Sequence, residues 1–201
     1  MKFILVRHAQ TTANVKAVII GGKEGGELSM RGTHQALALA RRLKKEKISE
    51  VYCSTASRAR QTCEAIVAGR DLEAVYWQGL REIDMGELVG LAHEEAEERY
   101  PGVFIDLFAR PSEKIPGGES VSDVQRRAMP LIERLACRPG NPTILAVGHN
   151  VVNRIIIASL VGLPLEKCKG IKQKNACITV LDVRQGFAQM YSLDNSLHSL
   201  M

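Results

Sequence analysis

Short apolar runs alternate with longer amphipathic segments along most of this chain. Four of the runs have the length and the β-branched or aromatic content of buried strands; they cover residues 2–6, 48–53, 72–77 and 142–147. Segments with helical periodicity follow most of them. This alternation predicts an α/β fold, in which a mostly parallel central sheet lies between two layers of helices (a three-layer α/β/α arrangement).

The expected helices cover about residues 29–45, 54–68, 120–137 and 151–161. Either Ser120 or Ser122 caps the third helix, and Pro130 inside it indicates a kink or a later helix start. The last two apolar segments, 176–183 and 187–193, predict a closing hairpin around Gln185-Gly186.

One span interrupts the alternation of strands and helices. Residues from about 86 to 119 contain a short acidic helix at 93–100 and then a loop rich in Pro and Gly. We therefore expect one domain over residues 1–201, with an inserted helical cap at about 86–119. The cap would lie over the carboxyl-terminal edge of the strands.

Composition narrows the classes of partner. The chain has 201 residues, a net charge of +5 and only 4% aromatic residues, so it has few rings to stack on bases and we expect no nucleic-acid partner. The charges are mixed, as in residues 41–47, which is typical of a solvated helix end. No apolar run reaches the roughly 18 residues of a membrane span, so we expect no membrane partner. A mild positive charge suits a small anionic substrate.

The five cysteines form no Cys-x-x-Cys pair, and their number is odd. We interpret them as reduced, mostly structural thiols, which favours a reducing compartment. Met1 and Lys2 lead directly into the first strand, without the pattern of a signal peptide. The expected location is therefore cytoplasmic. The apolar helices and an edge strand allow a homodimer without requiring one.

Candidate chemistry gathers where the predicted strands end. Arg7 and His8 follow the first strand, Arg58 lies in the first turn after the second, and His149 follows the strand at 142–147. Each side chain alone has an ordinary structural explanation. Together they would lie at the carboxyl edge of the sheet, where α/β proteins bind ligands. Two arginines and two histidines there predict a pocket for a dianion such as a phosphate group.

Five motifs, in order and over nearly the whole chain, resemble those of the histidine phosphatase superfamily, the group of phosphoglycerate mutases and small-molecule phosphatases. They are Leu5-Val6-Arg7-His8-Ala9 with Asn14, Ser54-x-x-x-Arg58-Ala59-x-Gln61-Thr62, Arg81-Glu82-x-x-x-Gly86-x-x-x-Gly90, Pro116-Gly117-Gly118-Glu119-Ser120 and Val147-Gly148-His149. The Arg-His pair alone is a weak signal, whereas the five motifs together are specific.

The resemblance implies a role for each matching residue. His8 would be the nucleophile that accepts the phosphoryl group on a ring nitrogen. Arg7, Arg58 and His149 would hold the phosphoryl oxygens and stabilise their charge. Glu82 would protonate the leaving oxygen and then activate water, instead of being an ordinary exposed loop carboxylate. For this chemistry His8 must be neutral and Glu82 protonated.

The resemblance also implies contacts around the phosphate. The Asn14 side chain and the backbone N–H of Asn150 would donate to its oxygens, and Gly21 and Arg81 are candidates for substrate contacts. The family needs no metal, so we expect no cofactor. The remaining histidines (His34, His93 and His198) are isolated in the sequence and predict no metal site.

The chain departs from the family pattern at three places. Ala9 and Asn150 stand where Gly is frequent after each histidine. The loop at residues 21–26 is richer in Gly than the usual form, which puts its substrate contacts in doubt.

Three functions compete on this evidence. A phosphatase acting on a small phosphorylated metabolite is favoured, because mutases of this family have a longer segment between the positions of Glu82 and His149. A phosphoglycerate mutase is the alternative, and a non-catalytic phosphate-binding protein is disfavoured by the intact motifs. We expect the 86–119 insertion to determine the substrate, with Arg81, Arg110 and Lys114 as candidates for binding a second anionic group.

Overall fold

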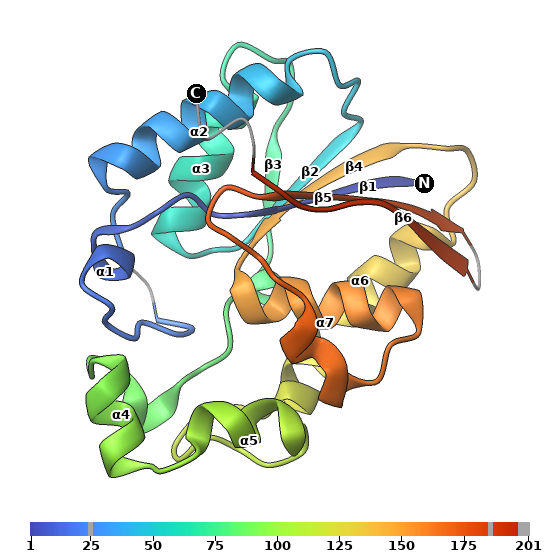
Figure 1. Cartoon of the computed structure of the whole chain (residues 1–201). Helices are drawn as coiled ribbons and strands as arrows, with labels where there is room; N and C mark the ends of the chain where they lie inside the picture. The colour runs from blue at the N-terminus through green and yellow to red at the C-terminus, as the bar shows by residue number, and fades with distance from the viewer. Residues whose placement is uncertain (24–25, 185–186, 197–201) are drawn as a thin grey trace.

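The computed structural model describes residues 1–23, 26–184 and 187–196, and in this part of the chain six strands form one sheet (Figure 1). The strand order is β3-β2-β4-β1-β5-β6. The first four strands are parallel, and β5 and β6 are antiparallel to their neighbours. The strands are β1 (Lys2–Arg7), β2 (Glu50–Cys53), β3 (Ala74–Tyr76), β4 (Thr143–Gly148), β5 (Ile178–Arg184) and β6 (Phe187–Asn195). The predicted mostly parallel sheet is confirmed.

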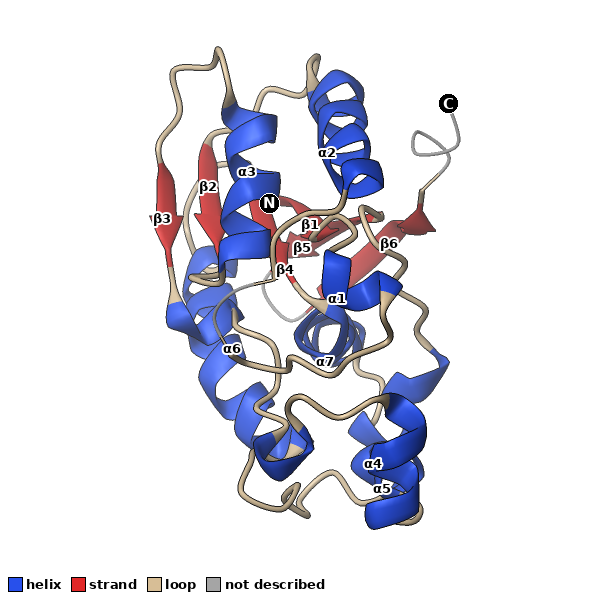
Figure 2. Ribbon diagram, turned by 90° about the vertical axis from the view of Figure 1, so that its left-hand side faces the viewer, coloured by secondary structure: helices blue, strands red, loops and turns tan. Residues whose placement is uncertain are grey.

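Helices cover both faces of this sheet, as Figure 2 shows. Helices α2 (Met30–Leu43) and α3 (Ser57–Val67) lie on one side, and α6 (Val121–Ala136) and α7 (Asn150–Val161) lie on the other. The predicted three-layer arrangement is therefore confirmed. The shorter helices are α1 (Thr12–Val15), α4 (His93–Arg99), α5 (Val103–Ala109) and the 3₁₀ helices η1 (Gln78–Leu80), η2 (Gly86–Leu88) and η3 (Leu165–Gly170).

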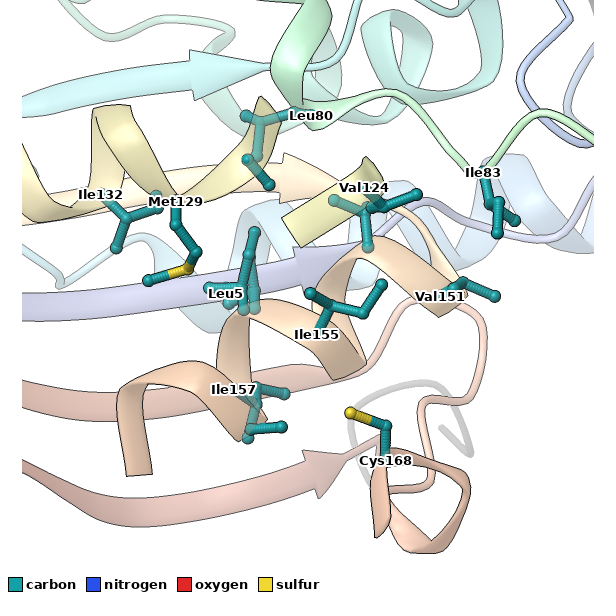
Figure 3. Packing of buried hydrophobic residues seen from close by; sticks show 14 of the residues in the cluster. Leu5, Leu80, Ile83, Val124, Met129, Ile132, Val151, Ile155, Ile157 and Cys168 are labelled. Carbon is teal, nitrogen blue, oxygen red and sulfur yellow. The ribbon is translucent and has the colours of Figure 1, made fainter. Parts of the chain in front are cut away.

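The alternation of side chains along β1 divides the core into two layers. Phe3 and Leu5 belong to the cluster that includes α6 and α7, whereas Ile4 and Val6 belong to the cluster beneath α2 and α3. Figure 3 shows Leu5 among the apolar side chains of α6 and α7. Because successive residues of a strand point to opposite faces, one run of apolar residues fills both layers.

Helix ends follow the local chemistry of the sequence. Ser120 is the cap of α6: its hydroxyl accepts from Asp123 N at 3.1 Å, and the Asp123 carboxylate accepts from Ser120 N at the same distance. This reciprocal pair decides between Ser120 and Ser122. Pro130 lies inside α6, so the alternative of a later helix start is wrong. Helix α1 and η3 are not among the elements expected from the sequence.

The 86–119 span contains η2, α4, α5 and a connecting loop. Its start is tied to the loop that follows β1, because Ile19 N donates to Leu91 O at 3.0 Å and Gly90 N donates to Ile19 O at 2.9 Å. In Figure 1, α4 lies below α1, on the side where the parallel strands end. At the other end of the chain, β5 and β6 form the expected hairpin pair, and the predicted turn at Gln185-Gly186 lies outside the described residues.

We expect the Leu5→Ala substitution to lower the free energy of unfolding by about 2–5 kcal/mol, because Leu5 is fully buried and its removal leaves a cavity. Leu37→Ala is the matched control: Leu37 lies on α2 and is 46% exposed, so its loss should cost about 0.5 kcal/mol or less. Urea unfolding of both variants measures the difference. Equal destabilisation would contradict this assignment of the core.

Candidate active site

The two histidines singled out by the sequence lie at the ends of neighbouring strands. Arg7 is paired with Gly148 in the β1–β4 register, and His8 N donates to Gly148 O at 3.0 Å. The ring centroids of His8 and His149 are therefore only 5.0 Å apart, with an interplanar angle of 59°. Both rings are buried. The structure thus brings His8 and His149 together, as the strand-end pattern predicts.

Hydrogen bonding decides which ring nitrogen of His8 carries the lone pair. His8 Nδ1 is 2.8 Å from the carbonyl oxygen of Ala9. Because a carbonyl oxygen can only accept, Nδ1 carries the proton when the ring is neutral, and the lone pair then lies on Nε2. The methyl group of Ala9 packs in the core beneath α2 and α3, so this departure from Gly is accommodated by the core.

Two arginines are fixed by backbone carbonyl groups. Arg7 Nη1 donates to Gln173 O at 2.5 Å, and Arg58 Nη2 donates to Gly21 O at 2.8 Å. Burial lowers the pKa of Arg58 to about 10, against the opposite effect of the Glu82 charge, so the guanidinium remains charged near neutral pH. Arg7 Nε is buried and has no hydrogen-bond partner among the described residues. Both cations are thus held in place, and Arg7 keeps a donor unused.

The same environment keeps the two histidines neutral. Burial lowers the pKa of His8 well below its usual value, and the charges of Arg7 and Arg58 lower it further. Burial, followed by the charge of Arg58, also lowers the pKa of His149 well below its usual value. A neutral His8 is what a nucleophilic imidazole requires.

Ser54 orients His149, which the sequence reasoning did not anticipate. His149 Nε2 lies 2.7 Å from Ser54 Oγ, and Ser54 N donates to Val147 O at 2.9 Å. Ser54 directly follows β2, the other neighbour of β4. The remaining ring nitrogen, Nδ1, is buried without a partner in the described part of the chain. The only sequence signal for Ser54 was its place in the second motif.

Glu82 lies against the first turn of α7. Its carboxylate accepts from Val151 N at 3.0 and 3.1 Å and from Val152 N at 3.1 Å. Free N–H groups at a helix N-terminus favour a negative charge, so this contact stabilises both the helix and the position of Glu82. Asn150 opens the helix, and no described residue accepts its backbone N–H. That N–H thus remains available, as the resemblance implies.

Asn14 belongs to the same edge of the sheet. Its side-chain oxygen accepts from Thr11 N at 3.1 Å and from the Asn175 side chain at 3.1 Å. Asn175 also donates to His8 O at 3.2 Å, which ties Asn14 to the residue expected to be the nucleophile. Because its oxygen is already occupied, the Asn14 side chain has its NH₂ group to offer to a ligand.

Arg81 and Gly21 border the site through the loop after α1. Arg81 Nε donates to Gly22 O at 3.0 Å, while Gly21 O is bound by Arg58. Gly22, Arg81 and Glu82 contribute to the wall of a cavity of about 520 Å³, which Trp77 also lines.

The other candidates from the sequence lie elsewhere. Arg110 and Lys114 are exposed on the inserted span, where Arg110 pairs with Glu113 at 3.3 Å and Lys114 lies 3.9 Å from Asp123. His93 contacts the Phe104 ring with centroids 5.0 Å apart. His198 lies outside the described residues.

No group of three or more His, Cys, Asp or Glu side chains in the described part of the chain is arranged to hold a metal ion. No helix in the described ranges is long and apolar enough to cross a membrane.

Comparisons with known proteins agree with the motifs. The family described as "Histidine phosphatase superfamily (branch 1)" matches residues 3–196. The chain is 31% identical to Phosphoserine phosphatase 1 of Hydrogenobacter thermophilus, over 98% of this chain and 94% of that protein. It is 29% identical to a "Probable phosphoglycerate mutase" of Serratia proteamaculans, over 92% and 86% of the two chains. The crystal structure of the alpha-ribazole phosphatase of Shigella flexneri is similar with a TM-score of 0.87, at 27% identity over 98% and 97% of the two chains.

We expect the free energy of unfolding to fall as the pH drops below about 6.5, because the unfolded chain then binds protons at His8 and His149 that the folded chain does not. Each histidine contributes up to about 1.4 kcal/mol per pH unit. Urea unfolding between pH 7.5 and 5.5 measures this slope. The doubly substituted His8→Gln/His149→Gln protein should have a smaller slope, and the variant of exposed His34, His34→Gln, should not. An unchanged slope in the double variant would contradict the neutral state of the two rings.

Proposed function

Because this chain belongs to the histidine phosphatase superfamily, we propose that it is a metal-independent phosphatase that hydrolyses a small phosphomonoester through a phosphohistidine on His8. The family membership and the named relatives support a phosphatase or mutase-like activity on phosphoric monoesters. Beyond this, we propose that the outcome is hydrolysis, that His8 is the nucleophile and that the reaction needs no metal.

The observation that carries the proposal is the state of His8. Its Nε2 has the lone pair, and its ring is kept neutral. Burial lowers the pKa of His8, and the charges of the fixed guanidinium groups of Arg7 and Arg58 lower it further. Cations at fixed positions stabilise the charge of a phosphoryl group in transfer without reorganising. His149 Nδ1, buried and without a described partner, supplies a further hydrogen bond to a phosphoryl oxygen.

Hydrolysis then proceeds in two displacements. His8 Nε2 attacks phosphorus, the P–N bond forms, and the P–O bond to the alcohol breaks as the leaving oxygen takes a proton from Glu82. Water next attacks the phosphohistidine while the Glu82 carboxylate takes its proton. The P–N bond breaks, inorganic phosphate leaves, and both His8 and Glu82 return to their starting states.

Glu82 must hold a proton for the first displacement. In the structure without a ligand its carboxylate accepts from the N-terminus of α7. The first displacement thus uses Glu82 in its carboxyl form, and the second displacement uses the carboxylate that the first one leaves behind.

A hydrolase is favoured over a mutase by the inserted span. A mutase has to exclude water from the phosphohistidine and pass the phosphoryl group to a second hydroxyl. Here the 86–119 span carries only two short α-helices, α4 and α5, and the 3₁₀ helix η2. The five cysteines are all unpaired thiols, which fits a reducing, cytoplasmic setting.

We expect release of inorganic phosphate from p-nitrophenyl phosphate in the presence of EDTA, and a loss of at least about 10³-fold in kcat for His8→Ala, because the nucleophile is gone. His34→Ala, at an exposed histidine on α2, is the control. Activity that vanishes in EDTA, or that persists in His8→Ala, would refute the mechanism. Interconversion of 3- and 2-phosphoglycerate without phosphate release would assign the chain to the mutases.

The Glu82→Gln substitution should lower kcat/KM, which reports the first displacement and not the later hydrolysis of the phosphohistidine, about 10²- to 10⁴-fold for an alkyl phosphate such as glycerol 3-phosphate. The loss should be much smaller for p-nitrophenyl phosphate, since p-nitrophenolate leaves without being protonated. Asp84→Asn, in the same cavity wall, is the control for a general change of charge. Equal losses for the two substrates would show that Glu82 does not act as the acid.

A further inference from the structure

The side chain of Asn175 bridges the expected nucleophile and a predicted phosphate ligand. Asn175 Nδ2 donates to His8 O at 3.2 Å and to Asn14 Oδ1 at 3.1 Å. An amide nitrogen carries two hydrogen atoms, and these two bonds use both of them. Because both acceptors lie within hydrogen-bond distance of one nitrogen, the Asn14 side chain lies next to the backbone of His8. The five family motifs do not include Asn175, and the proposed chemistry gives it no role.

These bonds decide the orientation of the Asn14 amide. Its Oδ1 also accepts from Thr11 N at 3.1 Å, so the oxygen faces Thr11 and Asn175. The NH₂ group on the other side of the amide then points away from both. Without the Asn175 bond, only the Thr11 contact would hold this orientation. A turned amide would present its oxygen to a phosphoryl oxygen, and two acceptors repel each other.

The residue after Asn175 adopts a strained backbone to reach the same carbonyl group. Ala176 has a φ of 58°, in the left-handed region that costs a residue with a Cβ roughly 1–2 kcal/mol. Its N–H donates to His8 O at 3.2 Å, so this carbonyl accepts from two consecutive residues. The ladder between β1 and β5 ends at the pair of Val6 and Ile178. The turn before β5 therefore extends the contact beyond the ladder, as far as His8.

The other end of this turn is anchored inside the protein. Gln173 is buried, and its side chain donates to Thr179 Oγ1 at 3.1 Å and to Lys172 O at 2.9 Å. Its carbonyl accepts from Arg7 Nη1 at 2.5 Å. The turn is thus attached to the core on one side and to Arg7 on the other, which gives Asn175 a fixed position.

The hydrogen bonds of Asn175 differ from those of an ordinary turn asparagine. Such a residue bonds to the backbone of its near neighbours and so closes its own turn. The partners of Asn175 are instead 167 and 161 positions away in the sequence. Its side chain therefore joins the segment before β5 to the loop that follows β1.

We propose that Asn175 is a positioning residue of the phosphate site. It holds the Asn14 amide with its NH₂ group toward the phosphoryl oxygens, and it fixes the carbonyl of His8. This inference rests on the proposed phosphatase function, in which Asn14 donates to the phosphoryl group. Asn175 does not itself have to touch the substrate, so its loss acts on phosphate affinity through Asn14.

Calorimetric titration with inorganic phosphate tests the inference without requiring turnover. Asn14→Ala should raise Kd about 10- to 100-fold, because a hydrogen bond to a charged oxygen is lost. Asn175→Ala should raise Kd about 3- to 10-fold, because the Asn14 amide can then turn. In the Asn14→Ala protein, Asn175→Ala should change Kd by less than about twofold, because the group that Asn175 positions is absent.

A second variant and a control accompany this cycle. Asn175→Asp keeps the shape of the side chain, but its carboxylate can only accept hydrogen bonds, so it should raise Kd at least as much as Asn175→Ala. Asn195→Ala removes an amide at the end of β6, opposite Ile178 of β5. This control should leave Kd within about twofold of the wild-type value.

Three results would overturn the inference. They are a wild-type Kd in Asn175→Ala or Asn175→Asp, an effect of Asn175→Ala that is equally large with and without the Asn14 side chain, and an equal loss of affinity in Asn195→Ala. Phosphate binding by a wild type that does not hydrolyse p-nitrophenyl phosphate would refute the proposed function alone. A wild type that does not bind phosphate would refute both.

Discussion

The parallel pairing of β1 with β4 is the constraint on which the site depends. The register that sets Arg7 opposite Gly148 also places the next residues, His8 and His149, side by side. A Cβ at Gly148 would lie 2.4 Å from Asn153 Oδ1, so any other residue there would displace the Asn153 side chain. Asn153 Nδ2 contacts Gln173 Oε1 at 3.4 Å, and the carbonyl of Gln173 accepts from Arg7. A substitution at Gly148 would therefore disturb, through Asn153 and Gln173, the contact that holds Arg7.

The pairing also concentrates positive charge where water is largely excluded. Arg7 and Arg58 are bound through their N–H groups to neutral carbonyls, which fix their direction without cancelling their charge. Because His8 and His149 are neutral, they add no repulsion to the positive charges of Arg7 and Arg58. The same neutrality lowers the free energy of unfolding at low pH. Glu82 is a single negative charge among these groups. Positive charge at such an edge attracts anions, which supports a phosphoryl group as the proposed ligand.

Much of this arrangement could be predicted from the sequence, because the patterns that mark the strands and their ends involve only residues close together in the chain. Strands end where the apolar runs end, and the residues that follow β1, β2 and β4 lie at one edge for topological reasons. The contacts that orient those residues could not be predicted. Ser54 and His149 are 95 positions apart in the sequence, and Glu82 and Val151 are 69 apart. Such pairs depend on how the layers pack, and neither partner carries a local pattern that points to the other.

Short elements were missed for a related reason. Helix α1 has four residues, and it depends on the reciprocal hydrogen bonds between Thr11 and Asn14. A helix this short has too few residues for periodicity to show, and isolated it would not be stable.

The position of Glu82 is decided by residues that need not touch the substrate. Arg127 donates to Glu82 O at 3.1 Å and pairs with Glu119, whose carboxylate in turn accepts from Asp84 N at 2.9 Å. Glu119 N also donates to Asp84 O at 3.0 Å. These bonds join the two ends of the 86–119 span to each other and to the backbone beside the acid. Because the ends are fixed there, the helices between them can differ in length and chemistry without moving Glu82 relative to α7. The position of Glu82, the proposed acid, is thus set by the ends of the 86–119 span and not by the helices between them.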